Sequence, residues 1–197
     1  MQLTRKGAET RQRIVAGAAD EVRDRGVTAL TLQDVLARTR TSKGQLFHYF
    51  PGGKDELLLA VAQHESDQQP SAEDLTTWAA WHDWRDRVVA HYRGAGERCT
   101  LSDLAAQPAR TALGAQAVIA RLLATRQAHL TAGIRHLQAT GEIDAELDAD
   151  RAAAALVAGI QGGVAVLMAT GSTAHLEAAL DIGIAGLRPR STPAKGC

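Results

Sequence analysis

The sequence predicts an all-α protein of about nine helices, on three observations. No run of β-branched residues alternates with polar ones, as a half-buried strand would require. Only 4% of the residues are aromatic, while alanine and glycine are plentiful, which suits closely packed helices. Several segments also begin at Ser, Thr or Asp and end at Gly or Pro, which are start and stop signals of helices.

An apolar stripe at four-residue spacing predicts the first helix, over residues 7–25. Its members are Ile14, Ala18 and Val22, which fall on one helical face. Gly26 follows, and a glycine at this place commonly ends a helix.

Two capping patterns predict a second and a third short helix joined by a tight turn. Thr31 is the expected N-cap of the second helix, with Asp34 three residues on as a variant of the capping box. Ser42 caps the third helix, and Gln45 completes the pattern S-x-x-Q. Phe50 is expected to enter the core that the three helices share.

Glycines and prolines divide the rest of the chain into further helices. The expected ranges are 54 to before 70, 73–95, a short helix at 101–107 and a long one at 109–140. The next helix is expected to begin near Asp148 and Asp150 and to run to residue 170, and the last is expected to be capped by Ser172 or Thr173 and to end near residue 187. The predicted domains are residues 1–54 and 55–187, followed by a disordered tail over 188–197.

The formal charge is zero, but it is unevenly distributed. Residues 1–54 hold ten Lys or Arg against five Asp or Glu, giving +5. Residues 55–197 hold twelve against seventeen, giving −5. A basic N-terminal domain followed by an acidic body is typical of a DNA-binding module that is joined to a domain with another role.

The first third of the chain resembles the TetR family of bacterial transcriptional regulators. The matching residues are Thr10, Arg11, Arg13 and Ile14, then Gly26, Thr31, SKGQLFHYF over residues 42–50 and KDEL over residues 54–57. The body agrees in length and helix count. The resemblance implies a three-helix helix-turn-helix head that binds DNA and a larger helical body that binds a ligand and dimerises.

This resemblance and the chemistry of the side chains select the DNA-binding residues. They are Thr31, Arg40, Thr41, Ser42, Lys43, Gly44, Gln45, His48, Tyr49 and Lys54. Hydroxyl groups and an ammonium group at helix starts suit phosphates, whereas Lys and Gln can meet guanine and adenine edges. Ser42 and Gln45 could instead only cap their own helix, and Tyr49 could only pack.

The turn departs from the family pattern. Arg40 stands where the family has glycine, and Thr41 where it has an apolar residue. A non-glycine residue in a left-handed conformation costs about 1 kcal/mol. Either a phosphate contact by Arg40 offsets this cost or the turn has another geometry. Phe47 also replaces a common Tyr, which removes one phosphate-contacting hydroxyl.

An effector site is expected in the body. Trp78, Trp81 and Trp84 recur every third residue, so each is rotated about 60° from the previous one. This stripe either lines a pocket for an apolar or aromatic effector or forms core. Further candidates are Tyr92, Cys99, His129, Gln161 and Met168. Cys99 is otherwise a buried thiol, or a redox sensor.

The last two helices are expected to form the interface of a homodimer. Gly159, Gly162 and Gly163 would permit close approach to a twofold copy in a four-helix interface. An Arg at Gly163 would then give monomers. The uncharged stretch 152–170 is not expected to span a membrane, because it is largely alanine and glycine and has Gln161 at its centre.

The expected function is a cytoplasmic, ligand-responsive repressor. A dimer would place its third helices about 34 Å apart on a near-palindromic operator. No HExxH, nucleophile elbow or phosphate loop occurs, so neither enzyme activity nor a metal or cofactor is expected. The alternative is a DNA-binding architectural or scaffold protein without an effector.

Overall fold

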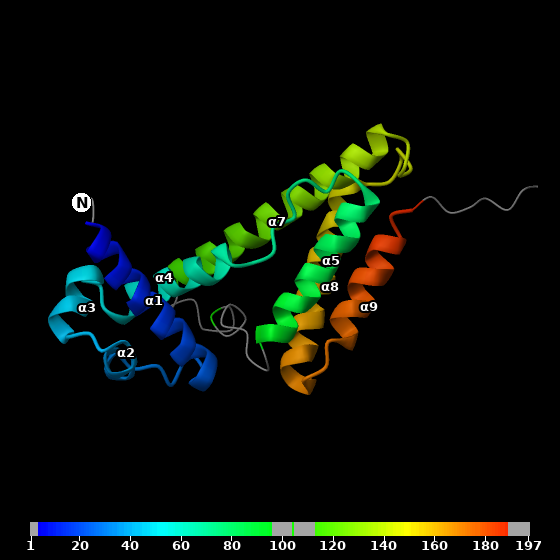
Figure 1. The fold of residues 1–197 in the computed structure, drawn as a ribbon. Helices are drawn as coiled ribbons and strands as arrows, with labels where there is room; N and C mark the ends of the chain where they lie inside the picture. Colours follow the sequence, from blue (N-terminus) through cyan, green and yellow to red (C-terminus); the bar gives the residue numbers. More distant parts are fainter. Residues whose placement is uncertain (1–3, 96–103, 105–112, 189–197) are drawn as a thin grey trace, which may run out of the picture. The chain divides into compact units, whose positions relative to one another are not determined.

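The structure is a computed structural model that describes residues 4–95, 104 and 113–188. This part of the chain contains eight helices and no strand, which confirms the all-α class (Figure 1). They are α1 (Arg5–Arg25), α2 (Leu32–Thr39), α3 (Lys43–Tyr49), α4 (Lys54–Asp67), α5 (Trp78–Ala95), α7 (Leu113–Ala139), α8 (Ala149–Thr170) and α9 (Ala174–Ala185). The predicted tail beyond Arg188, Cys99 and all but Leu104 of the predicted helix at 101–107 lie outside the described residues.

The chain forms two compact units. One comprises residues 1–69 and 98–122, and the other comprises residues 70–97 and 123–197. The first unit is called the head below, and the second the body. The predicted boundary at residue 54 does not coincide with this division, because α4 packs on α1 within the head.

The core of the head forms where α1 meets α2 and α4. Ile14, Leu46 and Phe50 are fully buried there, as their spacing predicted. Gly17 permits the contact between α1 and α2, since a Cβ atom at this position would overlap the methyl group of Thr39. The three-helix arrangement therefore depends on one small residue in α1.

Capping side chains set several of the helix starts. Thr31 caps α2, and Asp148 caps α8 by accepting from the amide of Arg151. Gly171 ends α8 in a left-handed conformation. These local signals explain why both helices begin and end close to the predicted residues.

The predicted start of α5 at residue 73 is wrong, because the helix begins at Trp78. Asp74 has a φ of 61°, which a helix does not tolerate. The Thr77 hydroxyl accepts a hydrogen bond from the Ala80 amide at 3.2 Å and so caps the helix five residues later than expected.

In the body, α8 packs against α9 along closely fitting small residues. A Cβ atom at Gly163 would lie 2.5 Å from the Cα atom of Leu176, and one at Gly183 would lie 2.5 Å from Leu156 Cδ2. These glycines therefore serve contacts between helices of the same chain.

Candidate nucleic-acid interface

The short helix α3 presents a polar face to solvent. Leu46 is fully buried on its inner side, whereas Lys43, Gly44, Gln45 and His48 are exposed. Gly44 has open space around it, because a Cβ atom there would meet only Ser42 Oγ at 3.9 Å. The predicted base-reading residues thus lie on the solvent side of one helix.

The predicted capping box at the start of α3 is present. Gln45 N donates to Ser42 Oγ at 3.1 Å, and Ser42 N donates to Gln45 Oε1 at 3.0 Å. Gln45 therefore caps its own helix, and a base contact by the same side chain stays a prediction. The box uses one lone pair of Gln45 Oε1, so a base contact would have to use the second lone pair or the Nε2 protons.

Tyr49, a predicted DNA-binding residue, is less exposed than Phe47, which was not predicted to bind DNA. Tyr49 is half-buried and packs edge-on against His48, with ring centroids 4.9 Å apart. Phe47 is 39% exposed, and Lys43 Nζ lies 6.0 Å from its ring centroid. Sequence reasoning left Phe47 out of the interface. Its i, i+4 spacing from Lys43 was the signal that places both on one face.

The turn between α2 and α3 has the left-handed geometry that usually selects glycine. Arg40 has φ 52° and ψ 41°, and its amide donates to Leu36 O. Its side chain is exposed. The alternative of a different turn geometry is therefore wrong.

Thr41 lies inward, unlike the other predicted DNA-binding residues of the turn and α3. It is only 7% exposed, and its hydroxyl lies 2.7 Å from the Thr39 hydroxyl. Thr39 in turn donates to Val35 O at 2.7 Å. This pair of hydroxyls satisfies a polar residue at a position that the family fills with an apolar one, so Thr41 supports the turn rather than facing DNA.

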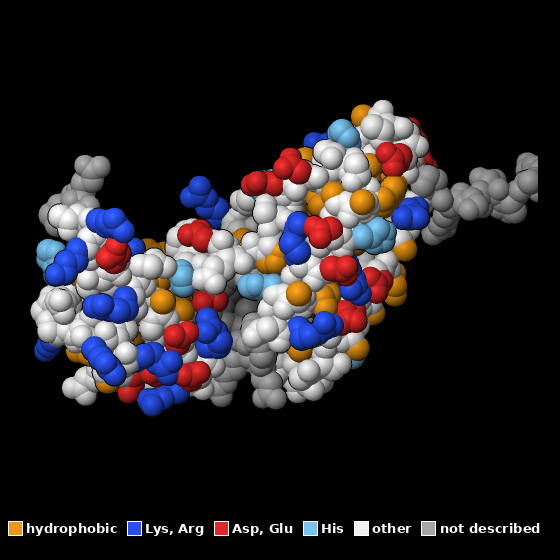
Figure 2. All heavy atoms as spheres, in the orientation of Figure 1, with side chains coloured by type: hydrophobic (Ala, Val, Ile, Leu, Met, Phe, Trp, Pro, Cys, Tyr) orange, Lys and Arg blue, Asp and Glu red, His pale blue; other side chains and the backbone are white. Residues whose placement is uncertain are grey.

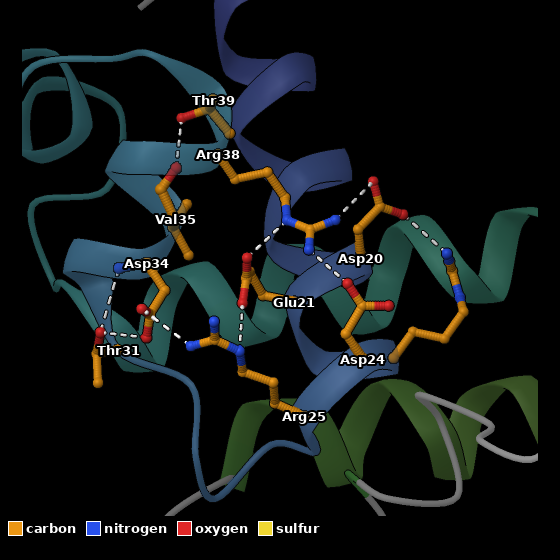
Figure 3. A network of polar contacts seen from close by, with 10 residues as sticks. Asp20, Glu21, Asp24, Arg25, Thr31, Asp34, Val35, Arg38 and Thr39 are labelled. Carbon is orange, nitrogen blue, oxygen red and sulfur yellow. Dashed lines mark hydrogen bonds and ion pairs between the residues drawn. The ribbon is translucent and has the colours of Figure 1, made fainter.

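Thr31 is exposed at the N-terminus of α2 but already has local partners (Figure 3). Its hydroxyl accepts from the Asp34 amide at 3.2 Å and donates to Asp34 Oδ2 at 2.6 Å. This hydrogen bond and the nearby Arg25 guanidinium lower the pKa of Asp34. A phosphate at this helix start would compete with the Asp34 carboxylate for the hydroxyl.

Lys54 begins α4, and its ammonium group is partly buried. Its Nζ donates to Leu30 O at 2.6 Å, which ties α4 to the loop between α1 and α2. The predicted phosphate contact would have to use the remaining two protons of the ammonium group. Lys54 is therefore a structural residue of the head as well as a candidate DNA contact.

A network of ion pairs joins α1 to α2 in the head (Figure 3). Arg38 Nε donates to Glu21 Oε1 at 2.6 Å, and the same guanidinium pairs with Asp24. These hydrogen bonds, that to Glu21 first, raise the pKa of Arg38. Glu21 is only 6% exposed, so this pairing compensates a nearly buried carboxylate.

The predicted effector residues of the body divide into buried and half-buried side chains. Trp81, Trp84 and Tyr92 are buried, whereas Trp78, His129, Gln161 and Met168 are half-buried. Two solvent-open hollows of about 380 and 350 Å³ lie on the body, and none of these seven residues lines either one. Cys99 lies outside the described residues.

Trp81 and Trp84 pack edge to face, with centroids 6.0 Å apart. The indole nitrogen of Trp81 donates to Leu75 O at 3.1 Å. The indole nitrogen of Trp84 is buried and has no hydrogen-bond partner within the described part of the chain. Trp81 and Trp84 therefore belong to the core, whereas Trp78 is only half-buried, and the Trp84 indole is an unsatisfied donor.

The three glycines predicted for dimerisation have different surroundings. Gly163 is buried against Leu176 of α9, and a Cβ atom at Gly159 would lie 3.3 Å from Ala179. Gly162 is exposed, and nothing lies within 4 Å of a Cβ atom there. An Arg at Gly163 would disrupt the α8–α9 packing of its own chain, so the predicted outcome of folded monomers is corrected.

Apolar residues are exposed to solvent on both α8 and α9 of the body. Ile182 of α9 is 74% exposed, and Ala158 and Ala165 of α8 are exposed on either side of Gly162. Among the described helices, α8 alone is long and apolar enough to cross a membrane by length and composition, with a mean hydropathy of 1.9. Only 33% of that apolar window is buried within the chain.

Comparison with known proteins gives a family match in the head. The model described as bacterial regulatory proteins, tetR family, matches residues 14–61. An uncharacterized HTH-type transcriptional regulator of Mycobacterium tuberculosis is 37% identical over 57 residues. The match covers 29% of this chain and 29% of that relative.

Solved structures resemble the chain over most of its length. A TetR transcriptional regulator from Chloroflexus aurantiacus superposes with a TM-score of 0.72 at 23% identity, covering 92% of this chain and 96% of that one. SmeT in complex with triclosan also gives a TM-score of 0.72, at 20% identity and 95% and 96% coverage. At these identities the likeness shows a shared fold.

Proposed function

We propose that this chain is a bacterial regulatory protein of the TetR family, and that it is a cytoplasmic repressor that a small molecule releases from DNA; the family match in the head supports this. The family consists of DNA-binding regulators rather than enzymes, in agreement with the absence of enzyme motifs from the sequence. The observation that carries the DNA-binding role is the exposed polar face of α3. Its capped N-terminus and Lys43 offer amide groups and a cation to the major groove.

A second copy of the chain is the proposed partner of α8 and α9. The exposed Ala158, Gly162 and Ala165 leave room for a helix to approach closely, and Ile182 is a large apolar side chain that a partner would cover. Two heads on one dimer would then meet two half-sites about one helical turn apart on a near-palindromic operator.

Ile182→Glu tests this interface without disturbing the contacts inside the chain. We expect sedimentation to show monomers for Ile182→Glu and dimers for the wild type, because the new carboxylate would lose its hydration in the interface. Asp181→Asn is unsuitable as a control because Asp181 accepts from Arg85. Glu146→Gln, at an exposed loop position, is the matched control. If the Ile182→Glu variant remains a dimer, the dimer interface does not cover Ile182 and this assignment is wrong.

The unsatisfied indole of Trp84 supports an effector with a hydrogen-bond acceptor. A buried donor without a partner costs about 1–3 kcal/mol, and a ligand carbonyl, ether or hydroxyl oxygen at this place would remove that cost. The aromatic neighbour Trp81 favours an uncharged, apolar or aromatic molecule. Triclosan, the molecule in the SmeT complex, has these properties and is the first compound to test.

A thermal-shift screen of uncharged aromatic compounds separates the repressor from the alternative, a DNA-binding scaffold without an effector. For the repressor, at least one compound raises the midpoint of the wild type and releases bound duplex, because it binds the two states of the protein unequally. The same compound should shift Trp84→Phe less than Trp81→Phe. DNA binding that no compound affects would favour the scaffold.

A further inference from the structure

A hollow of about 440 Å³ lies on the head between the middle of α1 and the end of α2. It is separate from the exposed face of α3. Gly17 and Thr39 lie in its lining, together with Arg13 from α1 and Arg40 from the turn. The lining at Gly17 is firmly fixed, because Gly17 packs against the Thr39 methyl group and the Thr39 hydroxyl is bound to Val35 O.

Two other charged groups line the hollow, and both are already neutralised. Arg38 is held by Glu21 and Asp24. Asp20 accepts from Arg23 at 2.8 Å and lies 3.9 Å from Arg38. Neither group therefore supplies an uncompensated charge to a ligand in the hollow.

The remaining two arginines, Arg13 and Arg40, have no such partner. The predicted head contains seven arginines, and five of them have a carboxylate or an aromatic ring beside them in the described structure. These pairs are Arg5 with Glu9, Arg11 with the Phe50 ring, Arg23 with Asp20, Arg25 with Asp34 and Arg38 with Glu21. Within the described residues, the side chains of Arg13 and Arg40 form no ion pair, hydrogen bond or ring contact, and both line this hollow.

We propose that this hollow binds a phosphate group of the DNA backbone between Arg13 and Arg40. This inference rests on the proposed DNA-binding function and adds to it a contact made by α1 and the turn. A guanidinium group pairs with a phosphate through two parallel hydrogen bonds, which makes arginine the preferred residue for such a site.

The position of Arg40 in the chain favours backbone phosphate over other anions. Arg40 stands two residues before Ser42, the N-cap of α3, so the hollow adjoins the end of α3 that carries Lys43. A duplex that lies against α3 brings its sugar-phosphate backbone past this end of the helix. The same contact explains an arginine where the left-handed backbone favours glycine, since the side chain serves binding rather than folding.

The test is the salt dependence of DNA binding by the full chain. A fluorescent mixed-sequence duplex of about 30 base pairs suffices, because phosphate contacts do not depend on sequence. The slope of log K against log salt changes by about 0.9 for each phosphate that the protein no longer neutralises. We expect the double variant Arg13→Gln, Arg40→Gln to lower the magnitude of the slope by about that amount per head and to weaken binding several-fold at about 0.1 M salt.

Two further variants control for charge and folding. Arg87→Gln removes one cation from an exposed site of the body and should leave the slope nearly unchanged. Arg40→Gly removes the cation and relaxes the left-handed backbone, so it remains folded and should lower the slope as Arg40→Gln does. Circular dichroism should show the same helix content for each variant as for the wild type.

A wild-type slope in the folded double variant, with DNA binding retained, overturns this inference and leaves the proposed function standing. A wild-type chain that binds no duplex at any salt overturns both. Inorganic phosphate is the other source of the same chemistry. If it stabilises the wild type but not the double variant while the DNA slope stays unchanged, the hollow holds free phosphate and this inference is wrong.

Discussion

At the scale of single residues, Trp81 and Trp84 are equally buried on α5 and differ in one hydrogen bond. Replacing Trp81 by Phe leaves Leu75 O without its donor, whereas replacing Trp84 by Phe removes a donor that has no partner. We therefore expect Trp81→Phe to lower the free energy of unfolding by about 1–2 kcal/mol more than Trp84→Phe does. Urea denaturation measures both values, and equal losses would mean that Trp84 has a partner in solution.

The stability of the head depends on pH through Asp34. The hydrogen bond from Thr31, and then Arg25, hold the pKa of this carboxyl group below its ordinary value. Such a group stabilises the fold above its unfolded-state pKa, near 3.9, and loses that contribution as the pH falls through the folded-state pKa. We expect Asp34→Asn to reduce the fall in thermal midpoint between about pH 5 and pH 3. If the thermal midpoints of Asp34→Asn and the wild type fall equally with pH, Asp34 contributes nothing to the pH dependence of stability.

At the scale of helices, Gly162 and Gly163 are neighbours in sequence on α8 with opposite surroundings. A methyl group at Gly163 would press on the backbone of Leu176, and overpacking of this kind typically costs about 1–3 kcal/mol. At Gly162 it meets open space, and alanine favours a helix over glycine by about 0.5–1 kcal/mol. Thermal unfolding should therefore show Gly163→Ala destabilised and Gly162→Ala unchanged or stabilised. The reverse order would contradict the α8–α9 packing.

Helix boundaries could be predicted where a local cap sets them. Thr31, Ser42 and Asp148 each bond to an amide three residues on, so the signal and the structure lie within one helical turn. The start of α5 also has a local cap, at Thr77, but the predicted start at residue 73 was wrong because the sequence does not show that the backbone at Asp74 is left-handed.

The candidate DNA-binding site could be predicted only in part, where a local cap or motif marks its residues. Ser42 and Lys43 follow from the motif and the cap. The inward position of Thr41 depends on Thr39, and the bond from Lys54 to Leu30 O spans 24 residues. The grouping of Arg13 with Arg40 depends on the approach of α1 to α2 at Gly17. Pairings of this kind between distant segments leave no local pattern in a single sequence.

At the scale of the whole molecule, DNA binding is proposed for the head, and effector binding and dimerisation are proposed for the body. The head contains the polar face of α3 and the two unpaired arginines, while the body contains the tryptophan core and the exposed apolar residues of α8 and α9. Figure 2 shows Lys and Arg side chains spread over the face of the head turned to the viewer. The charge of +5 on residues 1–54 against −5 on the rest accords with DNA binding by the head alone.

Selection of binding sites from a pool of randomised duplexes tests whether α3 reads a DNA sequence, since the pool contains candidate operators of every sequence. We expect the wild type to enrich a near-palindromic sequence with two half-sites about one helical turn apart. Lys43→Ala should keep the spacing but lose preference at one base position in each half-site. If the wild type enriches no sequence over the starting pool, α3 does not read a DNA sequence and the chain is not an operator-binding repressor.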